Sequence, residues 1–225
     1  MITILLPVYN DEKYLDECIR SIINQTHTDF KCLIGFNGTV DRSKEIANYL
    51  IYDDPRFKVF DYGMDKGKPK TLNKLLKEVE TEFICLIDGD DVWESTKLER
   101  QFDLRNNFDV IGTFTSYIDS AGNNIRNLDL PREDEEIKRG LVSGNNYIVN
   151  SSAFLRTRDA IEINGWDEGL DFLEDYDIWI RLYKNHKTFF NIKEYLVRHR
   201  IHSDSNFNSK PSNITIPELL SKNKI

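Results

Sequence analysis

The sequence predicts an α/β protein in which helices flank a mostly parallel central sheet. Apolar segments typical of buried strands alternate with amphipathic helices through residues 1–91. This order favours parallel strands joined by right-handed crossovers. The chain has 225 residues, of which 40% are hydrophobic and 30% charged, as expected for a globular protein with a sizeable core. No repeat or linker divides it, so we expect a single domain over residues 1–205 and a loop or tail over residues 206–225.

Residues 1–91 are expected to form four strands and three connecting helices. The predicted strands are residues 2–8, 30–36, 56–61 and 83–87. The helices are predicted from apolar residues that recur three and four positions apart. These are Leu15, Cys18, Ile19, Ile22 and Ile23 in the first helix, Ile46, Tyr49 and Leu50 in the second, and Leu72, Leu75, Leu76 and Val79 in the third. Neither G-x-G-x-x-G nor G-x-x-x-x-G-K-[ST] is present, which argues against a dinucleotide-binding protein or a P-loop NTPase.

Residues 92–205 have a less regular pattern. Helices are predicted over residues 97–104, 132–139 and 175–183, and strands over residues 110–118, 148–155 and 188–197. The stretch from Ser203 to Lys210 is rich in Ser and Asn and has no apolar periodicity, which indicates a loop.

The charge and the cysteines narrow the class of protein. A net charge of −8 and a pI of about 5.1 argue against nonspecific nucleic-acid binding, which needs a basic surface. Cys18, Cys32 and Cys85 lie in apolar patterns, so we expect buried, reduced thiols and a cytoplasmic location. No segment approaches the roughly 20 apolar residues of a membrane span, which leaves only peripheral association with a membrane.

The most informative segment is the run Asp88-Gly89-Asp90-Asp91 after the apolar residues 83–87. Open α/β sheets bind ligands at the carboxyl ends of their strands. Three carboxylates this close repel one another unless a cation or hydrogen-bond donors offset their charge. Mg²⁺ and Mn²⁺ prefer such oxygen ligands and often share them with substrate phosphates. A metal-assisted site for a phosphorylated ligand and a solvated acidic turn both fit this segment.

Four further segments combine with this acidic run. They are Pro7-Val8-Tyr9-Asn10, Asn37-Gly38-Thr39-Val40-Asp41, Asn164-Gly165-Trp166-Asp167-Glu168 and Glu174-Asp175-Tyr176-Asp177-Ile178-Trp179-Ile180-Arg181-Leu182. In this order and spacing the chain resembles the family 2 glycosyltransferases over residues 1–205. The resemblance implies a GT-A fold, a nucleotide-sugar donor, Mn²⁺ or Mg²⁺ as cofactor, and inversion at the anomeric carbon. It also implies a nucleotide-binding half over residues 1–91 and an acceptor-binding half over residues 92–205.

The resemblance places the nucleobase and ribose against Pro7, Tyr9 and Asn10. Asn37 stands where many members have an aspartate that contacts uracil. An amide both donates and accepts hydrogen bonds, whereas a carboxylate only accepts. This difference leaves the identity of the base open. Uridine remains the first expectation, with guanosine or thymidine next, and a simple Asn-Gly turn is the alternative for Asn37.

The diphosphate and the metal are expected near the acidic run. Lys68 is a candidate phosphate contact, although a solvated lysine is the alternative. Asp88 and Gly89 are implied nucleotide contacts, and Asp91 is implied to orient the donor sugar. The implied metal ligands are Asp90, Asp88 and His202. His202 is chosen over His199 on spacing, and Arg198 and Arg200 are further candidate phosphate clamps.

The resemblance assigns the chemistry to Asp175 as catalytic base, with Glu174 beside it. A capping pair at a helix N-terminus is the alternative, because the helix dipole favours acids there. Trp166, Asp167 and Glu168 are the implied acceptor contacts, although a core position fits Trp166 equally well.

The leading hypothesis is an inverting, metal-dependent transferase that acts on a glycan, lipid-linked sugar or protein acceptor. One alternative is a sugar-nucleotide nucleotidyltransferase, but Pro7-Val8-Tyr9-Asn10 differs from the glycine-rich loop expected there. The other is a non-catalytic nucleotide-sugar-binding domain of the same fold. The intact acids Asp88, Asp90 and Asp175 argue against it.

Overall fold

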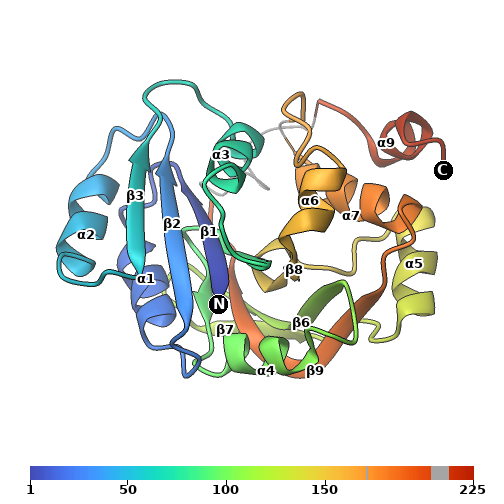
Figure 1. Ribbon diagram of the computed structural model, residues 1–225, viewed down its shortest axis with the longest axis horizontal. Coiled ribbons are helices and arrows are strands. Elements are labelled where there is room, and N and C mark those ends of the chain that lie inside the picture. Colours follow the sequence, from blue (N-terminus) through green and yellow to red (C-terminus); the bar gives the residue numbers. More distant parts are fainter. Residues whose placement is uncertain (171, 204–212) are drawn as a thin grey trace.

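The computed structural model describes residues 1–170, 172–203 and 213–225. Within these residues, nine strands form one sheet in the order β3-β2-β1-β4-β8-β6-β9-β5, with β7 paired to β6 (Figure 1). The strands are β1 (Ile2–Val8), β2 (Phe30–Phe36), β3 (Phe57–Asp61), β4 (Phe83–Leu86), β5 (Val92–Trp93), β6 (Val110–Ile118), β7 (Asn124–Leu128), β8 (Phe154–Arg156) and β9 (Phe189–Arg200). The helices are α1 (Leu15–Ile23), α2 (Ser43–Leu50), α3 (Lys68–Leu76), α4 (Lys97–Leu104), α5 (Asp134–Val142), α6 (Thr157–Glu162), α7 (Glu174–Lys184) and α9 (Ile216–Lys222), with a 3₁₀ turn at Asn150–Ser152.

The first four strands run parallel, which confirms the predicted α/β fold with a mostly parallel sheet. Ile2 lies beside Phe30 of β2 and Phe83 of β4. The carboxyl ends of β1, β2 and β4 therefore meet at one edge of the sheet. The loops that follow these strands carry residues 9–14, 37–42 and 87–91.

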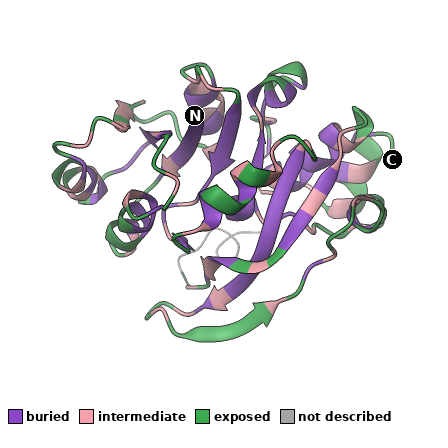
Figure 2. Ribbon diagram, turned by 60° about the horizontal axis from the view of Figure 1, so that its bottom comes forward, coloured by how far each residue is buried: buried purple, intermediate pink, exposed green. Residues whose placement is uncertain are grey.

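Helices cover both faces of the sheet. Alternate residues of β1 pack either against α1 and α2 or against α3 and α7, as the two core clusters show. Figure 2 shows the central strands buried, while the helices turn exposed faces outward. Each face of a central strand is therefore covered, which explains the nearly continuous apolar sequence of β1 and β4.

The second half extends the same sheet and adds antiparallel strands. β8 pairs antiparallel with β4 and β6, while the long strand β9 runs parallel to β6 over its whole length. The far end of β9 pairs with β5, just after the acidic run. This pairing brings Arg198 and His199 close to residues 88–91.

The predicted strand over residues 148–155 is wrong for most of its length. Residues 150–152 form a 3₁₀ turn, and only Phe154–Arg156 is a strand. The Ser152 hydroxyl donates to the Val149 carbonyl at 2.7 Å, a local bond that competes with strand pairing. The last predicted strand extends further than expected, to Arg200, because β5 and β6 both pair with its end.

The expectation of a loop or tail over residues 206–225 is wrong for α9. Thr215 and Glu218 form a capping box at its start, and Leu219 is fully buried against the core. Apart from Ser203, the predicted loop from Ser203 to Lys210 lies outside the described residues. No helix in the described part of the chain is long and apolar enough to cross a membrane.

Candidate functional site

Asp88 lies just beyond β4 and is enclosed by hydrogen-bond donors. Its two carboxylate oxygens lie 2.7 and 2.8 Å from the Lys68 ammonium nitrogen. The Asn150 amide donates to Asp88 Oδ2 at 3.1 Å, and the Asp88 backbone N–H donates to the Ser151 hydroxyl at 3.0 Å. The misread segment 150–152 thus helps to hold the acidic run in place.

Asp90 is paired with His202. The two meet at 3.0 Å between Asp90 Oδ2 and His202 Nε2, and both side chains are largely buried. β9 delivers the histidine to this point, since His202 follows its last residue by two positions. The placement of His202 beside Asp90 is the one that a shared metal site requires, and the metal role itself remains a prediction.

Asp91 faces the protein interior, so nothing around its side chain supports its contact with the donor sugar, which stays a prediction. Its side chain is fully buried and accepts hydrogen bonds from the Ser151 hydroxyl and, at 2.8 Å, from the Arg200 backbone N–H. His199 Nδ1 lies 3.0 Å from Asp91 Oδ2. Burial lowers the pKa of His199, but Asp91 outweighs it and raises that pKa to about 9. Asp91 therefore holds the end of β9 in place through His199 and Arg200.

Lys68 joins the acidic run to the start of α7. Its ammonium group lies 3.1 Å from Glu174 Oε1 as well as against Asp88. Burial acts to lower the pKa of Lys68, but Asp88 and Glu174 together raise it, so the lysine stays charged. Two predicted motifs that are far apart in the sequence thus share one cation.

Asp175 has the chemistry of a proton acceptor. Burial, and then the neighbouring Glu174, raise the pKa of Asp175 from 3.8 to about 7. The Asn146 amide donates to Asp175 Oδ2 at 3.0 Å, which orients the carboxylate. A carboxyl group with a pKa near neutrality is suited to general base catalysis.

The residues expected to bind a metal would form only part of a coordination shell. Among the described residues, no group of three or more His, Cys, Asp or Glu side chains is arranged to hold an ion. Asp90 and His202 offer one oxygen and one nitrogen donor, and Asp88 lies on the same loop. Such a partial set fits Mn²⁺ or Mg²⁺, because these ions commonly take further ligands from substrate phosphates and water. An imidazole ligand favours Mn²⁺ over Mg²⁺.

Asn37 lies at the end of β2 with its amide fixed. Its nitrogen donates to the Thr71 hydroxyl at 2.9 Å and to the Gly67 carbonyl at 3.4 Å. Its oxygen is buried, and no described residue donates a hydrogen bond to it. Tyr9 lies in the neighbouring loop, where its hydroxyl accepts from Lys66 Nζ at 3.0 Å.

The loop after β1 is shaped by Asn10. This residue has a positive φ of 57°, which asparagine tolerates better than most residues, and its side-chain oxygen accepts from the Val40 N–H at 2.9 Å. Pro7 lies within β1 opposite Gly35, one residue before the strand ends. These residues sit beside Asn37 at the carboxyl edge of the sheet, but their nucleotide contacts remain predictions.

Trp166 lies in the core, which matches the alternative given for it, and its contact with the acceptor stays a prediction. It is 2% exposed and packs within the cluster that contains α3 and α7. Asp167 forms an ion pair with Lys222 of α9, and Glu168 accepts a hydrogen bond from the Asn73 amide at 3.0 Å. Only Asp167 and Glu168 keep part of their surface available for an acceptor.

The expected phosphate clamp at Arg200 is wrong. Its side chain is 2% exposed and its N–H groups are used inside the protein. Nε donates to the Asp90 carbonyl at 2.9 Å, Nη1 to the Asp119 carbonyl at 3.1 Å, and Nη2 to Glu17. Arg198 lies 3.5 Å from Glu17 and is more exposed.

Asp11 is a site residue that the sequence analysis missed. Burial, and then the nearby Asp90, raise the pKa of Asp11 well above its usual value. A Cβ atom on Gly89 would lie 2.5 Å from an Asp11 carboxylate oxygen, so only glycine fits there. The signal available in the sequence is an acid directly after Pro7-Val8-Tyr9-Asn10.

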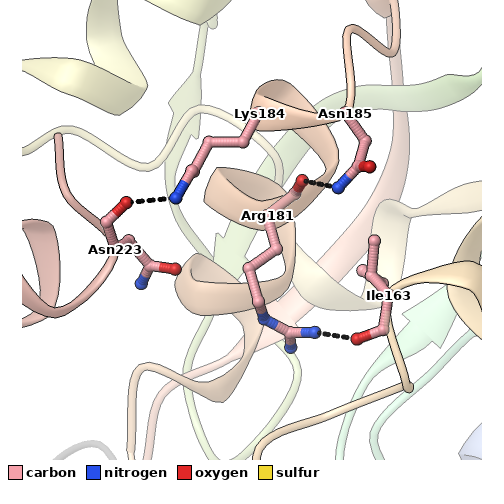
Figure 3. Close-up of a pocket in the computed structure, with 5 residues that line it drawn as sticks. All are labelled: Ile163, Arg181, Lys184, Asn185 and Asn223. Atoms are coloured by element: carbon pink, nitrogen blue, oxygen red, sulfur yellow. Dashed lines mark hydrogen bonds between the residues drawn. The ribbon is translucent and has the colours of Figure 1, made fainter.

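Two cavities lie outside this group of residues. One, of about 250 Å³, lies between α6, α7 and α9 and is lined by Ile163, Arg181, Lys184, Asn185 and Asn223 (Figure 3). The charged groups that line it already donate hydrogen bonds within the protein: Arg181 to the Ile163 carbonyl and Lys184 to the Asn223 carbonyl. The other, of about 410 Å³, lies beside β6 and β9. Neither is lined by the acidic run.

Known proteins share this sequence pattern. Residues 3–163 match the model of the family described as Glycosyl transferase family 2. An uncharacterized glycosyltransferase of Methanocaldococcus jannaschii is 28% identical over 216 residues, which cover 93% of this chain and 74% of that protein. The O-antigen biosynthesis glycosyltransferase WbnJ of Escherichia coli is 28% identical over 212 residues, covering 91% of this chain and 81% of that protein.

Solved structures share the fold. The complex of S. aureus TarS 1-349 with UDP-GlcNAc superposes with a TM-score of 0.77 at 19% identity, covering 93% of this chain and 61% of that one. The mannosyltransferase PcManGT from Pyrobaculum calidifontis, in complex with GDP-Man and Mn²⁺, gives a TM-score of 0.67 at 10% identity, covering 91% of this chain and 58% of that one. The chain thus spans less than two thirds of each of these solved structures. These likenesses confirm the GT-A type of α/β fold expected from the sequence.

Proposed function

Since this chain belongs to glycosyl transferase family 2 and is a glycosyltransferase, we propose that it moves a sugar from a uridine diphosphate sugar to an acceptor hydroxyl with inversion, assisted by a divalent metal. The observation that carries this proposal is the position of Lys68. One ammonium group lies 2.7 Å from Asp88 and 3.1 Å from Glu174, so the donor motif and the base motif face one site. The acceptor would be a glycan, a lipid-linked sugar or a protein.

Asp175 would act as the catalytic base. An inverting transfer needs one base within hydrogen-bond reach of the acceptor hydroxyl, on the face of the sugar opposite the leaving group. A pKa of about 7 leaves a large share of Asp175 deprotonated at neutral pH, while the carboxylate remains basic enough to take a proton. Asn146 would hold its orientation, and Glu174 would keep Lys68 beside it.

The leaving group would be bound at the acidic run. Asp90 and His202 would hold the metal ion, with Asp88 next to them. A bound divalent ion would offset the negative charge on the departing nucleoside diphosphate. Lys68, already charged and partly buried, would place a second positive charge on the same side of the donor.

Asn37 supports the choice of uridine. Its nitrogen donates to Thr71 and Gly67, and its oxygen is buried with no donor among the described residues, so this oxygen would be the atom left to accept a hydrogen bond from a base that reached it. Uracil offers a ring N–H donor that would match this acceptor, whereas cytosine presents an acceptor at the same position. Guanine also carries a ring N–H, so GDP is the competing ligand.

Ligand binding can be tested by thermal unfolding with UDP, GDP, dTDP and CDP, each with and without Mn²⁺. A ligand that binds only the folded state at 100 times its Kd stabilises it by about 2.7 kcal/mol. We expect a shift with UDP that grows when Mn²⁺ is added. A larger shift with GDP would replace uridine by guanosine, and no shift with any nucleotide would overturn the donor site.

Transfer can then be tested with UDP-sugars and candidate glycan acceptors, with NMR of the product to read its anomeric configuration. We expect inversion relative to the donor. Asp175→Asn should keep nucleotide binding and lose transfer. A protein that binds the nucleotide sugar and shows no turnover with any acceptor class would instead be a non-catalytic binder.

A further inference from the structure

Tyr14 belongs to none of the motifs found in the sequence. Its ring contacts the side chains of Arg200, the last residue of β9, and His202, two residues further on. The centre of its ring is 4.7 Å from the centre of the His202 imidazole, with an angle of 48° between the rings. On the same ring, the Arg200 guanidinium carbon lies 4.7 Å from the centroid. Tyr14 immediately precedes the first residue of α1, so that helix fixes its position.

We propose that Tyr14 is a positioning residue that holds the His202 imidazole at the distance from Asp90 needed to share a metal ion. This inference rests on the proposed function, because it assumes that Asp90 and His202 bind a divalent cation. Tyr14 is not one of those two ligands, and its ring would not contact the ion.

Arg200 gives Tyr14 a rigid support. Its guanidinium donates to the Asp90 carbonyl at 2.9 Å and to Glu17, one turn further along α1. The first turn of α1 thus presents a ring face and a carboxylate to one buried guanidinium. A cation over an aromatic face is attracted to it, and the attraction is stronger when the cation is desolvated, as Arg200 is here.

This arrangement ties the two expected metal ligands to a common framework. Arg200 holds the backbone of Asp90, and the ring that Arg200 stacks on also contacts His202. His202 follows the last residue of β9 by two positions, so its ring is brought against Tyr14 by the end of that strand. Packing against Tyr14 would therefore restrict the imidazole to orientations in which Nε2 faces Asp90. Residues that orient metal ligands typically change metal affinity 10- to 100-fold when they are mutated.

The test is a direct titration of the full chain with Mn²⁺ in the presence of UDP, in which EPR measures free and bound Mn²⁺. Wild type is compared with Tyr14→Phe, which keeps the ring, and with Tyr14→Leu, which removes it. His202→Ala serves as the reference for loss of a ligand. Circular dichroism and thermal unfolding report whether each variant is folded, and Tyr14→Met replaces Tyr14→Leu if the latter does not fold.

We expect Tyr14→Phe to bind Mn²⁺ within twofold of wild type, and Tyr14→Leu to bind it about tenfold more weakly. The EPR spectrum of bound Mn²⁺ should also broaden or shift in Tyr14→Leu alone, as a looser site would require. A Kd for folded Tyr14→Leu within twofold of wild type would overturn the inference and leave the proposed function intact. Equal weakening in Tyr14→Phe and Tyr14→Leu would overturn it too, because the hydroxyl rather than the ring would then be responsible. A wild-type protein that binds UDP but shows no bound Mn²⁺ in the titration would overturn the metal site and this inference together.

Discussion

At the scale of single residues, the ionised form of Asp175 is unfavourable in the folded protein, because the side chain is buried beside Glu174. Its raised pKa of about 7 means that the folded protein resists ionising this group. The folded pKa lies above the usual 3.8, so the contribution of Asp175 to stability is fully present below pH 4 and is lost as the pH rises through 7. The ionised base is thus formed at the expense of folding stability.

The first prediction follows from this loss of folding stability as Asp175 ionises. Asp175→Asn should have a higher Tm than wild type at pH 8, where the wild-type carboxylate is charged, and nearly the same Tm at pH 4. Thermal unfolding at both pH values measures this. A Tm at pH 8 equal to or below that of wild type would show that ionised Asp175 is not strained.

A second prediction concerns how the rate of sugar transfer depends on the protonation of Asp175. Because a base must be deprotonated, kcat/KM should fall tenfold per pH unit below the pKa of Asp175, which burial and Glu174 raise to about 7. Asp175→Asn should reduce kcat by about 10²–10⁴, the usual range for a general base. The pH–rate profile of wild type and the residual rate of the variant check both points. A flat profile between pH 5 and pH 8 would assign the base to another residue.

A third prediction separates Lys68 from its neighbour Lys70. Lys68→Ala leaves Asp88 and Glu174 facing each other without the shared cation, which should cost about 2 kcal/mol of unfolding free energy. Lys70 lies on the same helix as Lys68 and forms an exposed ion pair with Asp65, which precedes that helix. Lys70→Ala removes this pair and should cost less than about 1 kcal/mol of unfolding free energy. Urea denaturation compares the two variants. Equal losses would mean that the bridge contributes no more than a surface ion pair.

At the scale of elements, α9 holds in place the loop that carries Asp167. Lys222 of α9 pairs with Asp167, and the Asn223 amide donates to Asp177 of α7 at 3.0 Å. The helix has only seven residues, too short to be stable alone, so its packing must keep it formed. Leu219, its fully buried residue, supplies that packing.

The fourth prediction tests this anchoring. Leu219→Ala should lower the unfolding free energy by about 2–4 kcal/mol through the cavity it creates, while the exposed Ser221→Ala should change it by less than about 0.5 kcal/mol. Chemical denaturation measures both. If Leu219→Ala matched Ser221→Ala, α9 would be docked only loosely.

The elements also show what sequence patterns can and cannot predict. β1, β2 and β4 were predicted because their burial on both faces makes each strand almost continuously apolar, with Thr3 in β1 and Lys31 in β2 as the exceptions. The exposed hairpin strand β7 and the two-residue strand β5 carry no such pattern, since pairing with β6 and β9 alone defines them. α9 was missed because a single buried leucine and a capping box make a weak signal.

The same limit applies to the site. The resemblance to family 2 glycosyltransferases was enough to place Asp88, Asp90, His202 and Asp175 in a shared site. The opposite orientation of Asp91 was not predictable, because it depends on Ser151 and Arg200, which are far away in the sequence. Trp166 likewise enters the core through contacts with distant helices.

At the scale of the whole molecule, the two predicted halves share one core. The cluster around α3 combines Leu5, Leu33 and Leu72 from residues 1–91 with Ile178 and Trp179 from α7. The sheet is equally shared, because β4 of the first half pairs directly with β8 of the second. The proposed donor and acceptor regions are therefore parts of one packed unit.

The fifth prediction is that this unit unfolds in one cooperative step. Urea unfolding followed by tryptophan fluorescence should coincide with far-UV circular dichroism, because Trp93, Trp166 and Trp179 are buried in the two core clusters that the shared sheet connects. UDP with Mn²⁺ should move both curves to higher urea by the same amount, since a ligand that binds the folded state stabilises everything that unfolds with it. Two separated transitions, with only one displaced by the ligand, would show that the halves fold independently and that the nucleotide half carries the donor site by itself.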